Sequence, residues 1–146
     1  MMTDGDAGAS TSGGEKVVHN GGCHCGGVRF RARAERRLVA WDCNCSICAM
    51  KRNVHFIVPE EDFELLRGGD LLNEYAFGEH VARHRFCRTC GVQSFYHPRS
   101  NPNGVGVTVG CVDDGTIDFV EVRPFDGRNW DYTYQTSNIA ACSVAS

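Results

Sequence analysis

VARHRFCRTCGVQSFY, residues 81–96, places two cysteines on one tight turn between two runs of strand-forming residues. The run before Cys87 and the run after Cys90 both have the apolar and aromatic content of β-strands. Two thiolates separated by two residues can reach the same soft divalent metal ion. A strand, a metal-binding turn and a second strand are the arrangement of a zinc ribbon. This stretch therefore predicts a small β fold that a metal holds together.

Two further cysteine clusters lie outside the ribbon. They are Cys23-His24-Cys25 and Cys43-Asn44-Cys45-Ser46-Ile47-Cys48, so seven of the nine cysteines are clustered. Seven ligands are one short of two closed four-thiolate sites. A closed zinc site is usually structural, whereas three protein ligands leave a position for water or substrate. The count therefore predicts one structural zinc and one open zinc.

The spacing also indicates which cysteines share an ion. Three thiolates within six residues can all bind one zinc, which assigns Cys43, Cys45 and Cys48 to the open site. The pairs Cys23/Cys25 and Cys87/Cys90 then form the four-thiolate site, which brings their strands side by side. Two alternatives stay open: the pairs are redox dithiols, or both zincs are structural and Cys111, a histidine or an aspartate closes the second site.

The chain is predicted to be mainly β. Val28, Phe30, Ala32 and Ala34 alternate with arginines, which indicates a half-buried strand with a basic outer face. A short apolar run at 38–41 leads into the second cysteine cluster. Further strands are expected at 53–58, 63–66, 72–77, 81–86, 92–96, 105–109 and 117–122. A single helical turn is expected after Pro59, and no long amphipathic helix. Short strands separated by turns favour a sandwich or a folded-over sheet.

Composition predicts one domain with two polar ends. Residues 1–20 are rich in Gly, Ser, Thr and Asp and are expected to be disordered. Residues 21–132 form the expected zinc domain, and residues 133–146 a small polar tail. A domain of this size gains from metal cross-links, because its hydrophobic core is modest.

Nine cysteines in 146 residues would suit either disulfides or metals. The first residues lack the basic and apolar regions of a signal peptide, and cysteines two or three apart rarely form disulfides. We therefore expect a reduced, intracellular protein that is cytoplasmic, with an additional nuclear location left open. A net charge of -3 without a basic stripe argues against nucleic-acid binding. No apolar run is long enough to span a membrane.

An open zinc with three thiolates favours chemistry at sulfur. Three thiolates give the site a net charge of about -1, which makes the metal a weak Lewis acid toward water. A fourth thiol binds well, because zinc accepts soft ligands and lowers the thiol pKa. The predicted reaction is therefore attack by a bound thiol on an electrophile, or the reverse cleavage of a carbon–sulfur bond.

The motifs resemble the glutathione-dependent formaldehyde-activating enzyme family. The resemblance covers about residues 21–130 and is carried by GCHCG (22–26), DCNCSIC (42–48), HFIVP (55–59) and FCRTCGVQSFY (86–96). PRSNP (98–102) and CVDDGT (111–116) make it most similar to the centromere protein V branch.

This resemblance implies an Mss4-like folded β-sheet with a zinc ribbon. It implies a structural zinc on Cys23, Cys25, Cys87 and Cys90, and a catalytic-type zinc on Cys43, Cys45 and Cys48. It also implies carbon–sulfur lyase activity, with formation of S-hydroxymethylglutathione as the founding reaction. The alternative is a zinc-stabilised module that binds a protein partner, with a centromere or cell-division role. The oligomeric state stays open.

Four further residues are candidates for the site. Glutathione is anionic, so Lys51, Arg52 or Arg99 is expected to hold a substrate carboxylate, the alternative being a solvated basic face. His55 follows the three-cysteine cluster and is a candidate proton shuttle, hydrogen-bond donor or fourth metal ligand. Its alternative is a histidine that is satisfied within the sheet.

Overall fold

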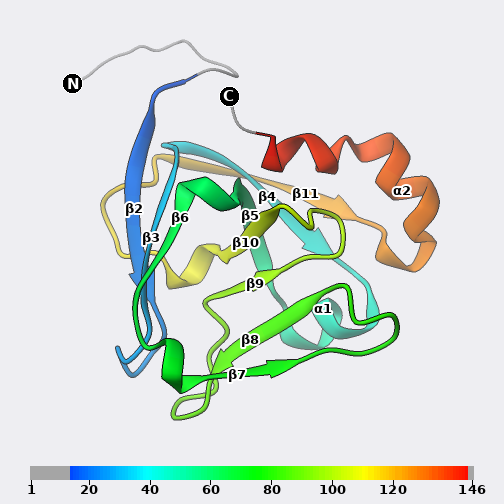
Figure 1. Cartoon of the computed structure of the whole chain (residues 1–146). Coiled ribbons are helices and arrows are strands. Elements are labelled where there is room, and N and C mark those ends of the chain that lie inside the picture. Colours follow the sequence, from blue (N-terminus) through cyan, green and yellow to red (C-terminus); the bar gives the residue numbers. More distant parts are fainter. Residues whose placement is uncertain (1–13, 145–146) are drawn as a thin grey trace.

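The computed structural model describes residues 14–144, which form two β-sheets (Figure 1). The large sheet has the order β11-β4-β5-β10-β9-β8-β7, and the small sheet the order β2-β3-β6. The large sheet contains β4 (Arg37–Cys43), β5 (Val54–Pro59), β7 (Leu72–Tyr75), β8 (Arg83–Cys87), β9 (Phe95–His97), β10 (Gly104–Thr108) and β11 (Phe119–Phe125). The small sheet contains β2 (Lys16–Gly22), β3 (Arg29–Glu35) and β6 (Phe63–Arg67). The mainly β prediction is confirmed.

Short helices connect the strands. Within the described residues, the α-helices are α1 (Ser46–Lys51) and α2 (Trp130–Ser137). The single-turn or short 3₁₀ segments are η1 (Glu60–Asp62), η2 (Gly69–Leu71), η3 (Val109–Cys111), η4 (Gly127–Asn129) and η5 (Ile139–Ser143). The turn expected after Pro59 is η1. The sequence did not predict α1, because its six residues lie within a metal-binding motif and show no apolar periodicity.

The main core lies between the two sheets. Along β3 the alternation is as predicted: Phe30 and Ala32 are fully buried, while Arg31 and Arg33 are exposed. Phe30 stacks on Phe63 of β6 with ring centroids 5.6 Å apart. β5 and β10 complete the core from the large sheet. Burial of these side chains stabilises the packing of one sheet on the other.

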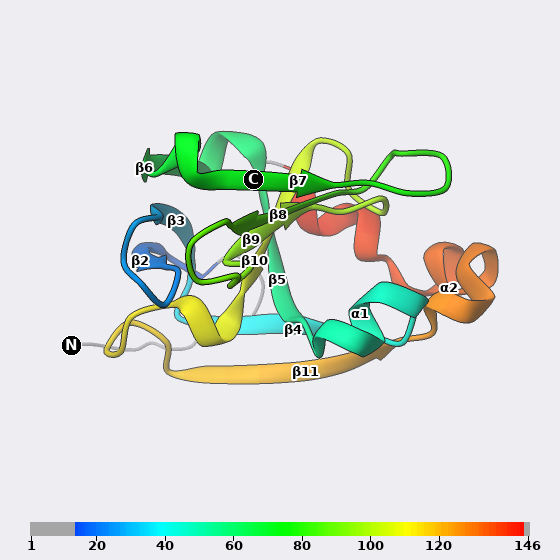
Figure 2. The same ribbon diagram turned by 90° about the horizontal axis from the view of Figure 1, so that it is seen from below.

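β11 pairs with β4 in parallel, whereas the other strand pairs within residues 14–144 are antiparallel. The register runs from Phe119 opposite Arg37 to Phe125 opposite Cys43. β11 therefore ends beside the beginning of the three-cysteine motif. Figure 2 shows that α1 and α2 consequently lie at the same end of the molecule.

The ordered segment begins earlier than composition indicates. The predicted boundary was residue 21, but β2 begins at Lys16 and pairs along its whole length with β3. The side chain of His19 is fully buried and contacts the Thr116 hydroxyl and the Glu35 carbonyl oxygen. Those partners are distant in sequence, so local composition does not reveal them. The expected disorder of residues 1–13 lies outside the described residues.

The expected C-terminal tail also differs from the structure. α2 and η5 occupy most of residues 133–143, and Ile139 is only 2% exposed. Ile139 packs with Trp41, Ile57 and Phe125 in a second, smaller core. Asn101 holds this segment with hydrogen bonds from its amide to the Ile139 carbonyl and the Ser143 hydroxyl. A polar, small-residue segment is thus ordered by contacts with the large sheet.

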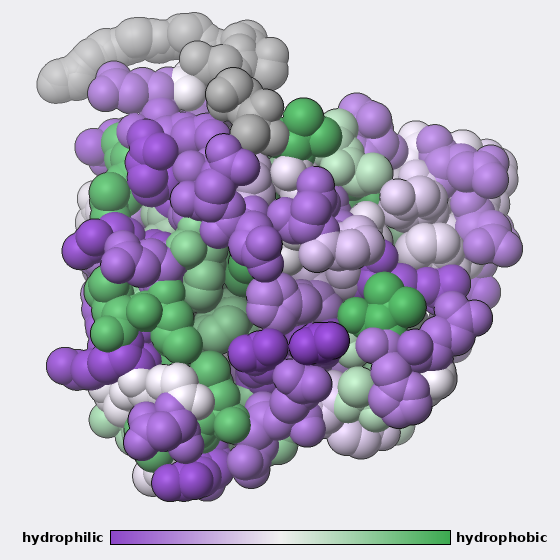
Figure 3. Space-filling view, in the orientation of Figure 1, coloured by the Kyte–Doolittle hydropathy of each residue, from purple (hydrophilic) through white to green (hydrophobic). Residues whose placement is uncertain are grey.

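Figure 3 shows polar side chains over most of one face, with a hydrophobic strip over the small sheet and η2. Within residues 14–144, no helix is long and apolar enough to cross a membrane.

Candidate metal centres and active-site cavity

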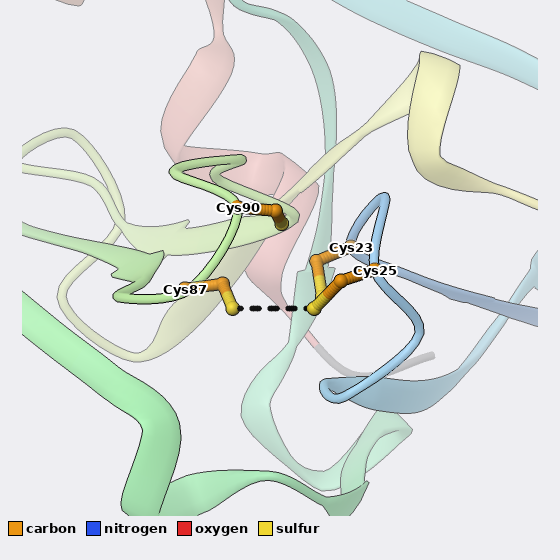
Figure 4. A group of neighbouring side chains, drawn as sticks. All are labelled: Cys23, Cys25, Cys87 and Cys90. Atoms are coloured by element: carbon orange, nitrogen blue, oxygen red, sulfur yellow. Dashed lines mark hydrogen bonds between the residues drawn. The ribbon is translucent and has the colours of Figure 1, made fainter.

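Four cysteines from two distant segments converge at the junction of the two sheets. Cys23 and Cys25 lie on the turn between β2 and β3, and Cys87 and Cys90 on the turn after β8 (Figure 4). The Cys25 sulfur is 3.6 Å from that of Cys23 and 3.7 Å from that of Cys87. Four sulfurs at about 2.3 Å from one zinc lie about 3.8 Å apart. The donor set therefore fits a tetrahedral soft metal.

Backbone amides orient two of these sulfurs. The Val28 amide donates to the Cys23 sulfur at 3.3 Å, and the Thr89 amide donates to the Cys87 sulfur at 3.4 Å. All four thiols are free rather than paired as disulfides. Amide donors stabilise thiolates, which are the form that binds metal. An ion at this point would connect the small sheet to the ribbon.

Three further cysteines converge where β4 ends and α1 begins. The sulfurs of Cys43, Cys45 and Cys48 all lie within 4.8 Å of one another. The extended backbone of Cys45 precedes the helix, and the Cys45 amide donates to the Cys43 sulfur at 3.4 Å. One turn of α1 then brings Cys48, which is 5% exposed, back to the other two. The structure thus groups the cysteines as four and three, as their spacing predicts.

The three thiols perturb one another strongly. Hydrogen bonds from the thiols of Cys43 and Cys48 lower the pKa of Cys45 to about 2. Donation to Cys45 raises the pKa of Cys43 to about 11, and hydrogen bonding to its two neighbours raises the pKa of Cys48. One thiolate is therefore stabilised by its neighbours, whereas three thiolates this close repel one another unless a cation lies between them.

The segment after β11 closes over this cluster. Asn44 anchors it: the Asn44 amide donates to the Phe125 carbonyl oxygen at 3.1 Å, and the Arg128 side chain donates to the Asn44 carbonyl oxygen at 3.0 Å. A Cβ atom at Gly127 would lie 2.7 Å from the Cys43 sulfur and 2.7 Å from the Cys45 Cβ. Only glycine allows the chain to pass this close.

A cavity of about 420 Å³ opens beside the three cysteines. Its polar lining includes two histidines, a tyrosine and two arginines, which are His55, His84, Tyr96, Arg99 and Arg128. Its apolar lining includes aromatic residues from β4, β11 and α2, which are Trp41, Phe125 and Trp130. The connection between β7 and β8 forms another wall. The combination of one reactive cluster, apolar walls and a few polar groups is typical of a small-molecule site.

The structure brings some predicted residues to the cavity and not others. His55 and Arg99 line it. Lys51 does not: its amino group donates to the Gln93 side chain at 2.5 Å and lies over the Phe86 ring. Arg52 does not line it either, because its left-handed backbone (φ 55°) ends α1 and turns the chain toward β5. Their expected contact with substrate is thus not supported by their positions.

Cys111 belongs to neither cluster. It packs near the four-cysteine site, where burial and the charges of Cys23 and Cys90 raise its pKa to about 11. The alternative in which Cys111 closes the three-cysteine site is therefore wrong for this arrangement.

The sequence did not identify His84, Tyr96 or Arg128 as residues of the site. His84 is 2% exposed, and neither ring nitrogen has a hydrogen-bond partner within the described chain. One signal was available for His84: it lies between Arg83 and Arg85, so strand alternation places it on the face opposite to both. The sequence spacing gives no sign that Arg128 lies near the cysteines. It lies there because β11, which precedes it, pairs with β4.

Comparison with known proteins agrees with this arrangement. The model of the family described as "glutathione-dependent formaldehyde-activating enzyme" matches residues 18–125. The chain belongs to this family. A crystal structure of a Rhodobacter sphaeroides protein, a structural genomics target, matches with a TM-score of 0.59 and 31% sequence identity. That match covers 70% of this chain and 99% of the other. Family membership and the two cysteine clusters confirm the Mss4-like fold.

Proposed function

We propose that the protein is a zinc-dependent enzyme of the carbon–sulfur lyase class that acts on a thiol adduct such as S-hydroxymethylglutathione. The observation that carries this proposal is the contrast between the two cysteine clusters. Four sulfurs surround one position, whereas three sulfurs border the other and a cavity occupies the remaining side. Family membership supports the same class of substrate.

The donor set decides what a bound metal contributes. A zinc ion held by Cys43, Cys45 and Cys48 would accept a substrate thiol at its fourth position and lower the pKa of that thiol. The cavity lining would exclude water, because Trp41, Phe125 and Trp130 cover it with apolar surface. The Tyr96 hydroxyl would face the carbon and oxygen of the adduct, with His55 behind it at 3.1 Å.

Two arginines make the cavity suitable for an anionic thiol. The Arg99 guanidinium lies 3.8 Å from the centroid of the Trp130 ring, which in turn stacks on Tyr134 at 4.6 Å. Within residues 14–144, Arg99 forms no ion pair with a carboxylate. A fixed guanidinium without an acidic partner can bind a substrate carboxylate through two hydrogen bonds. Arg128 is the second candidate cation.

Metal content and thiol response test the proposal. The protein is expected to bind two Zn²⁺ or two Co²⁺ per chain, and glutathione is expected to change the cobalt absorption of one site only. Cys45→Ser should keep the fold and one metal but lose the glutathione response. Cys142→Ser is the matched control, because Cys142 packs in the smaller core outside both clusters, and it should behave as wild type.

Catalysis is measured by NMR exchange between ¹³C-formaldehyde, glutathione and their adduct. The zinc-loaded protein should accelerate this exchange, and Cys45→Ser should not. Two metals that are both insensitive to glutathione, with no acceleration of exchange, would refute the enzyme and leave a zinc-stabilised binding module.

The finer relationship to the centromere protein V branch is also a proposal. It is supported by PRSNP at 98–102 and CVDDGT at 111–116. Asn101 in the first motif is 1% exposed and binds the segment that contains Ile139 and Ser143. A phylogenetic tree that places the chain outside that branch would refute it.

A further inference from the structure

A hydrogen-bond chain of fixed direction ends in the cavity. His55 is 2% exposed, and its Nδ1 atom lies 3.4 Å from the carbonyl oxygen of Asn53. A carbonyl oxygen only accepts, so Nδ1 carries the ring proton. Burial also lowers the pKa of His55 to about 4, which keeps the imidazole neutral near pH 7. Its Nε2 atom is therefore an acceptor.

The acceptor on His55 determines the orientation of the Tyr96 hydroxyl. Tyr96 Oη lies 3.1 Å from His55 Nε2 and donates its only proton to it. The Tyr96 oxygen consequently has only lone pairs to offer on its other side. Tyr96 lines the same cavity as the three cysteines.

The fold holds both rings in this relationship. β10 lies between β5, which carries His55, and β9, which carries Tyr96, and Gly106 is paired with Tyr96 across β10 and β9. A Cβ at Gly106 would lie 2.6 Å from the Tyr96 ring and 3.1 Å from the His55 ring. The absent side chain lets the two rings meet edge to face at 5.1 Å. His84 stacks on Tyr96 at 5.1 Å and restricts its rotation further.

We propose that Tyr96 Oη accepts a hydrogen bond from the hydroxyl group on the carbon attached to the substrate sulfur. The site thereby selects a hydroxyalkyl thioether adduct over the same thiol carrying a plain alkyl group. His55 is a positioning residue, because it acts only by fixing the direction of the Tyr96 hydroxyl. This inference rests on the proposed function, since it names the group that the cavity recognises in a thiol adduct.

The direction of this hydrogen-bond chain also allows the site to distinguish the adduct from a free aldehyde. An aldehyde oxygen has no proton to donate, and the Tyr96 proton is already committed to His55, so the pair makes no hydrogen bond with a free aldehyde. A site that pairs with a substrate hydroxyl discriminates strongly against analogues that lack it, because its polar groups are then left unpaired.

Binding to two glutathione derivatives tests the proposal. One is the S-hydroxymethyl adduct formed in solution from glutathione and formaldehyde, and the other is S-methylglutathione, which lacks the hydroxyl group. Tyr96→Phe should weaken binding of the adduct about 3- to 10-fold and leave S-methylglutathione unchanged. Tyr75→Phe is the matched control: it removes the same hydroxyl from a half-exposed ring outside the cavity and should change neither.

His55 variants test the positioning role. His55→Gln retains an acceptor at a similar reach and should keep most of the discrimination between the two derivatives, whereas His55→Leu should lose it. ¹⁵N NMR of the zinc-loaded protein without substrate should show His55 protonated at Nδ1 and not at Nε2. Tyr96→Phe should shift the Nε2 resonance.

Each contrary result has a distinct meaning. A His55 protonated at Nε2 overturns the inference without reference to any substrate. Equal weakening of both derivatives by Tyr96→Phe shows a structural role only, and no weakening of either shows that the hydrogen bond is not made. A wild-type protein that binds glutathione but does not distinguish the two derivatives overturns this inference alone, whereas one that binds no thiol overturns the proposed function as well.

Discussion

Gly127→Ala is expected to disrupt the three-cysteine site while leaving the four-cysteine site intact. The added Cβ would lie 2.7 Å from the Cys43 sulfur, 2.7 Å from the Cys45 Cβ and 3.1 Å from the Cys45 amide nitrogen. Non-bonded carbon atoms prefer separations of about 3.5–4.0 Å, so the overlap is about 1 Å. The Cys45 Cβ and amide nitrogen are fixed by the backbone, so the backbone must move.

The size of the effect follows from that overlap. One extra carbon in a tightly packed position costs about 1–3 kcal/mol. The steric strain from the added Cβ is greatest when a metal ion holds the three sulfurs together. Without the ion, the segment that contains residue 127 can move away from Cys43 and Cys45. At about 1.4 kcal/mol per tenfold change, the affinity of this site for metal should fall roughly 5- to 150-fold.

Competition with a chelator measures the result, with the sulfur-to-cobalt charge-transfer absorption as the signal for each site. Gly110→Ala is the matched control, since a Cβ there meets no atom within 4 Å and Gly110 has no left-handed backbone. It should retain both metals at wild-type affinity. If Gly127→Ala binds metal at both sites with wild-type affinity, the close approach of the segment after β11 to Cys43 and Cys45 is refuted.

Three other perturbations have defined outcomes. Cys87→Ser should bind one metal fewer and be unfolded by circular dichroism at 25 °C, because structural zinc contributes about 10–16 kcal/mol in small domains; a folded variant would contradict this. Asp62→Ala should lower the free energy of unfolding in urea by about 1–3 kcal/mol, because Asp62 is 7% exposed and accepts from Lys16 at 2.6 Å and Arg33 at 3.3 Å. The pKa of His55 is lowered to about 4, against about 6.5 in an unfolded chain, so the unfolded chain takes up this proton first as the pH falls. Its contribution to stability is complete above pH 6.5 and declines toward pH 4, by up to about 1.4 kcal/mol per pH unit. Urea titrations at pH 7, 6 and 5 should therefore show that the free energy of unfolding falls less with decreasing pH in His55→Gln than in wild type. An equal fall in the two proteins would contradict this prediction.

Local pattern was enough to predict the metal-binding elements. Two or three thiols on one turn form a ligand set whatever the tertiary structure of the remaining chain. The grouping of Cys43, Cys45 and Cys48 could therefore be predicted from spacing. The pairing of the Cys23 turn with the Cys87 turn was readable from the ligand count. Strand alternation predicted the buried face of β3 for the same reason, since it depends only on neighbouring residues.

The cavity was not readable in this way, because its walls come from separate parts of the chain. Arg128 reaches the cysteines through the parallel pairing of β11 with β4, and no local signal indicates that pairing. The contact between His55 and Tyr96 depends on the absence of a side chain at Gly106, in a third strand. His19 shows the same limit within β2, since its partners lie 16 and 97 residues away.

The late position of β11 has a consequence for biogenesis. A ribosome releases the chain from its N-terminus, so all four ligands of the four-cysteine site leave the ribosome before residues 125–139 do. Part of the cavity wall beside Cys43, Cys45 and Cys48 comes from residues 125–139 and is added only afterwards. The nascent chain can therefore acquire its first ion and fold its ribbon while the other three thiols are still uncovered. Maturation of this protein would then be ordered in time, with the stapling ion first and the reactive one last.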